Sequence, residues 1–227
     1  MGQHSSSPLR VYYDPQSYNC IRVLVYLREA NLPHQLIKVS LVESDFDEEF
    51  LRRNPKKRVP FLMHGDTITI DDSVGIIEYL GRIAPNEDLF PTKDQSSCAL
   101  NCRLIGKYHH KLEPKSVLGA VMWLQKSRAE IGEERIQELF KELDSWEDYL
   151  AQENEYLLGK NVATSDIIAF PVIACFFWLL GLSEKDYPFL AAWYHRMRSR
   201  SSIKDLEFWQ SYVPKNEWKV LAVRKFS

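Results

Sequence analysis

The sequence has almost no net charge. Its 227 residues include 29 Lys and Arg and 31 Asp and Glu, which leaves −2 at pH 7. Because binding to nucleic acid or to an anionic membrane depends on a positive field, neither partner is expected. Cysteine is also scarce, and the four cysteines form no Cys-x-x-Cys pair, which excludes a disulfide framework and a zinc or redox site of that spacing. Small molecules or other proteins are the expected partners.

Signals for export or membrane insertion are missing too. Residues 1–8 are mostly polar and predict a flexible leader, and the chain has no Asn-x-Ser/Thr sequon, so a cytoplasmic location is expected. Gly2 and Ser6 loosely fit a myristoylation pattern, although a plain polar leader also explains them. The longest apolar run, 167–182, is shorter than the ~20 residues of a membrane span. It predicts a helix that is surrounded by protein.

The first third of the chain alternates strand and helix patterns. Leu9, Val11 and Tyr13 recur at every second position, as in a strand, and Gly65-Asp66 separates two short apolar stretches, as in a hairpin. The expected elements are strand 9–13, helix 20–31, strand 34–40, helix 45–53, strands 60–64 and 67–70, and a helix that starts at 72–73. A helix between the first two strands predicts that they are parallel. The order βαβαββα predicts an α/β, thioredoxin-like domain over 9–85.

The rest of the chain reads as helical. Turn-forming residues suggest a linker at 86–94, and an apolar stripe with helical spacing runs from Ile136 to Leu150. An all-α domain is therefore expected over 95–227. From Arg196 onward there are eight Lys and Arg against three Asp and Glu, which fits a solvated helix end or contact with an anionic partner.

Four motifs occur in order along nearly the whole chain. They are Ser17-x-x-Cys20-x-Arg22-Val23, Asn54-Pro55-x-x-Arg58-Val59-Pro60, Asp72-Ser73-x-x-Ile76-x-x-Tyr79-Leu80 and Gly159-x-x-Val162-x-x-x-Asp166. Each is weak alone, but together they resemble the cytosolic glutathione S-transferases. Phe170-Pro171-Val172 and the stretch 198–204 look most similar to the serine-type rho class and its theta relatives.

The resemblance implies a binding site for glutathione. Val59-Pro60 would form a cis bond and offer the Val59 backbone to the cysteinyl part of the tripeptide, a short strand addition; an ordinary trans proline is the alternative. Asp72 and Ser73 would hold the γ-glutamyl end at a helix N-terminus, or simply cap that helix. Arg58 would help to hold the far carboxylate, or face solvent.

The resemblance also implies that Ser17 is the catalytic hydroxyl. It would donate a hydrogen bond to the glutathione sulfur and favour the thiolate, helped by the N-terminus of the following helix. Two rivals remain open. Tyr12 lies near the position of the phenol in tyrosine-type classes, and Cys20, in the first helical turn, could have a lowered pKa of its own. A turn or capping role for Ser17 is the plain alternative.

The substrate pocket and the partners are less determined. Candidate residues for an apolar acceptor pocket are Tyr108, Leu112, Trp123, Trp209 and Tyr212. Adjacent His109 and His110 cannot face one metal from a helix, so no metal is expected. Family similarity implies a homodimer. Ala163 stands where relatives have a capping Ser or Thr, which predicts a weakened helix start.

The expected function is conjugation of reduced glutathione to small hydrophobic electrophiles, a detoxification reaction. Two other functions remain open. One is a glutathione-dependent thiol oxidoreductase or peroxidase that uses Cys20, and the other is a noncatalytic binding or scaffolding protein that kept the fold.

Overall fold

The computed structural model describes residues 8–41, 46–112, 121, 124–152, 154–211 and 218–222. Contacts divide the chain into two compact units, with a boundary between Asn86 and Glu87. The described part of the first unit is 8–86, less 42–45, together with 205–211. Of the expected leader at 1–8, only residue 8 is among the described residues, so Gly2 lies outside them.

The first unit contains a four-stranded sheet with the order β2-β1-β3-β4. Its strands are β1 (Leu9–Tyr13), β2 (Gln35–Lys38), β3 (Phe61–His64) and β4 (Ile68–Ile70). β1 pairs parallel with β2 and antiparallel with β3, and β3 pairs antiparallel with β4. The predicted βαβ unit and hairpin are confirmed, and Gly65 has the positive φ of 59° that its turn needs.

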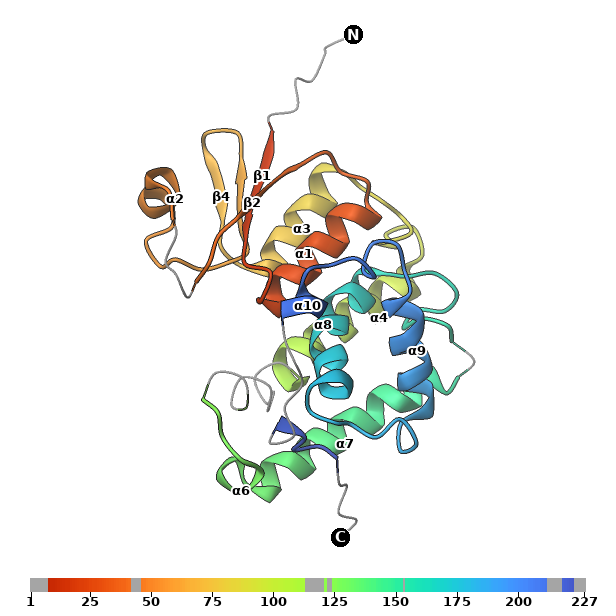
Figure 1. Ribbon diagram of the computed structural model, residues 1–227. Coiled ribbons are helices and arrows are strands. Elements are labelled where there is room, and N and C mark those ends of the chain that lie inside the picture. The colour runs from red at the N-terminus through yellow and green to blue at the C-terminus, as the bar shows by residue number, and fades with distance from the viewer. Residues whose placement is uncertain are drawn as a thin grey trace. The chain divides into compact units, whose positions relative to one another are not determined.

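Three helices accompany this sheet: α1 (Tyr18–Glu29), α2 (Glu48–Arg53) and α3 (Ser73–Ile83). Figure 1 shows α1 and α3 side by side next to the sheet, and α2 on the other side of it. The thioredoxin-like order βαβαββα is therefore confirmed. The predicted end of α2 at Arg53 and start of α3 agree with the structure, whereas the other predicted helix ends differ by two or three residues, because apolar periodicity marks the buried face of a helix and not its ends.

The described helices of the second unit are α4 (Gln95–Lys107), the π-helical turn η1 (Tyr108–Leu112), α6 (Arg128–Ile131), α7 (Glu133–Leu150), α8 (Thr164–Trp178) and α9 (Pro188–Arg198). The predicted stripe of α7 is buried from Ile136 to Leu150. As expected from the apolar run, α8 is buried on all sides: every residue from Thr164 to Phe177 is inside. No helix in the described part of the chain is long and apolar enough to cross a bilayer.

The start of α8 is held by Asp166. Its carboxylate accepts the backbone N–H of Ala163 at 2.9 Å, that of Leu157 at 2.9 Å and the indole N–H of Trp193 at 2.7 Å. Ala163, at the cap position, has no side-chain oxygen for this role, as expected. Thr164 instead donates its hydroxyl to the Leu89 carbonyl, 2.7 Å away. The buried carboxylate thus ties three segments of the second unit together.

Residues 205–211 pack with the first unit, whereas the sequence-based division places them in 95–227. This segment carries α10 (Phe208–Ser211), drawn beside the first turn of α1 in Figure 1. Leu206 and Phe208 are buried, and Glu207 accepts a hydrogen bond from Lys38 on β2 at 2.6 Å. The chain therefore returns to the first unit after its helical stretch.

Candidate glutathione site in the first unit

Ser17 lies in the tight turn that joins β1 to α1. Its backbone N–H donates to the Asp14 carbonyl at 3.0 Å, and its own carbonyl accepts the N–H of Cys20 at 2.9 Å. Ser17 occupies the cap position of α1, but within the described residues its side chain makes no capping hydrogen bond. The hydroxyl therefore sits at the positive end of a helix without being used to close it.

Asp14 shapes this turn, a role that the sequence analysis did not assign. Its side chain is buried, and its two carboxylate oxygens accept the N–H of Gln16 at 2.8 Å and the N–H of Leu41 at 2.9 Å. An Asp that directly follows a strand and accepts from the residue two positions on is a known turn signal. The second hydrogen bond, from the Leu41 N–H beyond β2, forms only once β1 and β2 pair, so no local sequence signal predicts it.

Cys20 is buried beneath the turn, with 1% of its surface exposed. Burial raises the pKa of its thiol to about 12, although a hydrogen bond with the Ser17 side chain acts in the opposite direction. The position in the first helical turn suggests a lowered pKa, but the loss of hydration outweighs the helix end here. At neutral pH Cys20 is a protonated thiol within hydrogen-bonding reach of Ser17.

Tyr12 points into a different environment. It is 1% exposed and belongs to an apolar cluster with Val39, Phe50, Phe61 and Met63. Its ring centroid lies 5.0 Å from that of Phe50 and 6.0 Å from that of Phe61. Burial, together with the charge of Asp47 and a hydrogen bond to it, raises the pKa of the phenol to about 12. A side chain packed in this way is poorly placed to reach a bound thiol.

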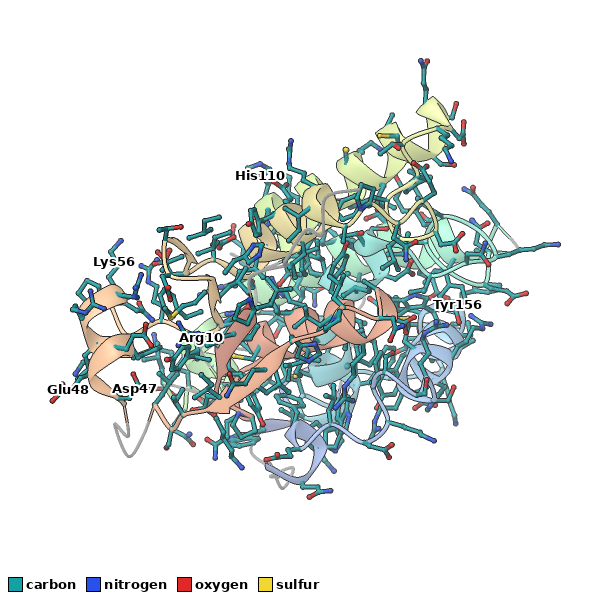
Figure 2. The ribbon with its side chains drawn as sticks, turned by 90° about the horizontal axis from the view of Figure 1, so that it is seen from above. Arg10, Asp47, Glu48, Lys56, His110 and Tyr156 are labelled. Carbon is teal, nitrogen blue, oxygen red and sulfur yellow. The ribbon has the colours of Figure 1, made fainter. Side chains whose placement is uncertain are left out.

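The loop after α2 leads to a cis peptide bond between Val59 and Pro60. Asn54 fixes this loop through its side-chain amide, which donates to the Arg58 carbonyl at 2.7 Å and accepts the Arg58 N–H at 3.3 Å. Figure 2 shows Asp47 and Glu48 at one end of α2 and Lys56 at the other, where the loop begins. Arg58 itself is exposed.

Asp72 and Ser73 stand at the start of α3. The Asp72 carboxylate accepts the N–H of Val74 at 3.1 Å and that of Gly75 at 2.7 Å, so Asp72 caps the helix. Ser73 is the first helical residue, 7% exposed, and its hydroxyl takes no part in this cap. The two adjacent residues thus have different roles, and the sequence alone does not show which of them caps the helix.

The Ser73 hydroxyl accepts a hydrogen bond from the Arg22 guanidinium at 3.3 Å. Arg22 is 0% exposed, and it links α1 to α3 across 51 positions of sequence. Arg22 belongs to the first of the four motifs, but the sequence predicts no role for it. Arg22 stands between Ile21 and Val23 in the sequence, and nothing in that local pattern indicates that an arginine there is buried.

A cavity of about 100 Å³ lies beside the Ser17 turn within the first unit. Its lining mixes polar and charged side chains with apolar ones: Ser17, Asp14, Arg28, Asp205 and Glu207 are polar or charged, and α1, β2 and the 205–208 segment also supply apolar side chains. The apolar lining residues include Ile21, Leu24, Leu36, Leu206 and Phe208. The hydroxyl of Ser17 is thus next to a space that admits a small apolar group.

The structure describes three of the five expected acceptor-pocket residues, and they belong to two different units. Tyr108 and Leu112 are fully buried in the core of the second unit. Trp209 lies on α10 in the first unit, half-buried and edge-on to Phe208. Trp123 and Tyr212 lie outside the described residues. Over the described ranges, no three His, Cys, Asp or Glu side chains come together as a metal site would require.

Comparison with known proteins agrees with this geometry. A family model described as Glutathione S-transferase, N-terminal domain, matches residues 11–88, and one described as Glutathione S-transferase, C-terminal domain, matches residues 129–196. The mouse protein Glutathione S-transferase theta-1 is 26% identical over 200 residues, which cover 84% of this chain and 82% of that protein.

Solved structures share the fold. A glutathione S-transferase from the Antarctic clam Laternula elliptica superposes with a TM-score of 0.81 at 24% identity, over 95% of this chain and 99% of that one. A glutathione transferase homologue from Drosophila mojavensis, solved with bound glutathione, gives a TM-score of 0.73 at 24% identity, over 86% and 89% of the two chains. With both of its halves matched in order, this chain belongs to the glutathione S-transferase family.

Proposed function

We propose that this protein is a glutathione transferase that conjugates the thiol of reduced glutathione to small hydrophobic electrophiles, with Ser17 as the catalytic hydroxyl. The observation that carries the proposal is the state of Ser17: it stands at the N-terminus of α1, its hydroxyl is not used as a cap, and it borders a cavity. A hydroxyl in that position can donate to a sulfur anion while the helix end adds positive potential.

The size of the required effect is modest. A free thiol has a pKa of about 8.5, and lowering it by about two units corresponds to roughly 2.7 kcal/mol of preferential stabilisation of the thiolate. One hydrogen bond to a charged group contributes ~1.5 to 3 kcal/mol. A larger shift would weaken the nucleophile, because the reactivity of a thiolate falls with its pKa. Ser17 and the end of α1 are therefore sufficient in magnitude.

The remainder of glutathione would bind along the first unit. The Val59 backbone precedes the cis bond to Pro60 and would pair with the cysteinyl residue. Ser73 would hold the γ-glutamyl carboxylate, while Asp72, engaged as a cap, would contribute mainly by fixing the helix start. Arg58 is exposed and available to the glycine carboxylate.

The electrophile would enter next to Ser17. The apolar side chains of Leu36, Leu206 and Phe208 in the cavity lining would contact a small apolar group, and Trp209 on α10 adjoins Phe208. We also propose the serine-type assignment, a homodimer and a cytoplasmic location, which rest on the family motifs and on the cysteine pattern.

The test compares Ser17→Ala with wild type and with Ser96→Ala, a change of an exposed serine on α4. We expect Ser17→Ala to lower the conjugation of a chlorinated dinitrobenzene by about tenfold or more, to raise the pKa of bound glutathione measured by thiolate absorbance, and to leave glutathione affinity nearly unchanged. Ser96→Ala should match wild type. Unchanged turnover in Ser17→Ala would remove Ser17 from the mechanism.

Two other outcomes would point elsewhere. Glutathione binding without turnover over a broad set of electrophiles would indicate a binding or scaffolding protein. Reduction of dehydroascorbate or disulfides that is lost in Cys20→Ser would indicate a thiol oxidoreductase, a function that the burial of Cys20 and its raised pKa disfavour.

A further inference from the structure

Arg22 is a charged side chain in the interior of the first unit. None of its surface is exposed, and its Nη1 donates to the Ser73 hydroxyl at 3.3 Å. A guanidinium keeps its proton in proteins because its pKa exceeds about 12. Placing such a group inside a protein is costly. The position therefore calls for a role beyond filling space between α1 and α3.

The hydrogen bond sets the direction of the Ser73 hydroxyl. A serine hydroxyl has one hydrogen to donate and two lone pairs that accept. Because Arg22 occupies an acceptor position on Oγ, the hydroxyl hydrogen is directed away from Arg22. A donor polarised by a cation behind it is a stronger donor. Ser73 is thus prepared to donate to an anion at the start of α3.

The charge of Arg22 also reaches the other end of the site. It acts on the Cys20 thiol, where it favours the ionised form, and Cys20 is the residue that contacts the side chain of Ser17. One buried cation therefore acts on a residue of α1 and on a residue of α3. Charge interactions are strong in such a place, because little water screens them.

We propose that Arg22 is a positioning residue that acts through Ser73 to select a carboxylate at the start of α3. This rests on the proposed function, in which Ser73 holds the α-carboxylate of the γ-glutamyl residue; the role of Arg22 goes beyond it. Arg22 does not touch the ligand. It orients and polarises the hydroxyl that does, and its charge complements the carboxylate.

The probe is a pair of tripeptides that differ in this group alone. One is reduced glutathione. In the other, γ-aminobutyrate replaces the γ-glutamyl residue, so that only the α-carboxylate is missing. Calorimetry gives the dissociation constant of each with wild type, Arg22→Met, Arg22→Lys and Arg82→Met. Arg82 is an exposed arginine on α3 and supplies the matched control.

We expect wild type and Arg82→Met to prefer glutathione by about tenfold or more, the size of a hydrogen bond to a charged group. Arg22→Met should reduce that preference to about threefold or less, while affinity for the decarboxylated tripeptide stays near its wild-type value. Arg22→Lys, which keeps the charge, should fall between them. A purely structural role would instead weaken both tripeptides equally, and that result would overturn the proposal.

A double-mutant cycle makes the test independent of whether Arg22→Met folds. If Arg22 acts through Ser73, Arg22→Lys should cost little further preference in a Ser73→Ala background. Full additivity of the two changes would contradict the proposal. If wild type binds neither tripeptide, the proposed function fails with it; if wild type prefers glutathione and the Arg22 variants keep that preference, only the role of Arg22 fails.

Discussion

The Asp14 carboxylate accepts the backbone N–H of Leu41 at 2.9 Å, across 27 positions of sequence. Its other oxygen holds the N–H of Gln16 in the turn before Ser17. One side chain therefore joins the turn that holds Ser17 to the segment that follows β2. Because both donors are backbone groups, the link depends on the acceptor and not on the identity of its partners.

Replacing Asp14 should destabilise the turn and slow the reaction. Asp14→Ala removes the acceptor of two partly buried hydrogen bonds, each of which contributes about 0.5 to 1.5 kcal/mol. We expect the unfolding free energy to fall by about 1 to 3 kcal/mol and turnover by about tenfold. Asp14→Asn, which keeps one acceptor, should lose less. Denaturant unfolding measures the stability, and steady-state kinetics measure the turnover. The control is Asp148→Asn, a change of an exposed residue. A loss of stability with unchanged turnover would exclude a role for Asp14 in placing Ser17.

Cys20 should resist alkylation in the folded protein. Cys20 and Cys175 are buried, Cys98 is partly exposed and Cys102 is exposed, so iodoacetamide at pH 8 should modify the last two and spare the first two, as read by peptide mass spectrometry. Rapid modification of Cys20 in native protein would show that the turn opens.

The raised pKa of Cys20 also has a consequence for stability. The pKa is about 12 in the folded protein and ~8.5 for a free thiol. A raised folded pKa means that the contribution to stability is complete below about pH 8 and is lost as the pH rises toward 12. We expect the unfolding free energy to decrease above about pH 9, and Cys20→Ala to reduce that decrease. An identical pH profile in the variant would contradict this assignment.

Tyr12 should tolerate loss of its hydroxyl. Tyr12→Phe keeps the ring against Phe50 and Phe61, so turnover should stay within about twofold, and loss of the hydrogen bond to Asp47 should cost about 1 kcal/mol. Tyr12→Ala opens a cavity and should cost ~3 to 5 kcal/mol. A tenfold drop in turnover for Tyr12→Phe, measured with unchanged stability, would instead make the phenol the activator.

Asp166 should be essential to the stability of the second unit. Asp166→Ala removes the acceptor of three N–H groups, from Leu157, Ala163 and Trp193, and we expect a loss of at least about 3 kcal/mol in thermal or denaturant unfolding. Exposed Asp186→Ala should change stability by less than about 0.5 kcal/mol. Comparable stability of the two variants would show that the network contributes little.

The sequence predicts the framework of the first unit because its signals are local. Alternation marks β1, Gly65 marks the hairpin, and Asp72 marks the start of α3, and each depends on neighbouring residues only. The burial of Arg22 follows from the packing of α1 on α3, and the bond from Asp14 to Leu41 follows from the pairing of β1 with β2. Both join positions far apart in the chain, so periodicity carries no information about them.

The expected acceptor-pocket residues show the same limit of sequence patterns. Tyr108 and Leu112 are apolar at helical spacing, a pattern that a core residue and a pocket residue share. The structure buries both completely. Leu206 and Phe208, which line the cavity at Ser17, belong to the 205–211 segment, far along the chain from residues 8–86 of the same unit, so their place next to α1 emerges only from the fold.

That return of the chain limits how the molecule can be divided. A fragment ending at residue 86 would keep every strand, yet its face along α1 would be bare where Leu206 and Phe208 now cover it. Exchanging the first half with that of a relative would seat a foreign α1 against the native 205–211. Working chimaeras should therefore take both stretches from the same parent.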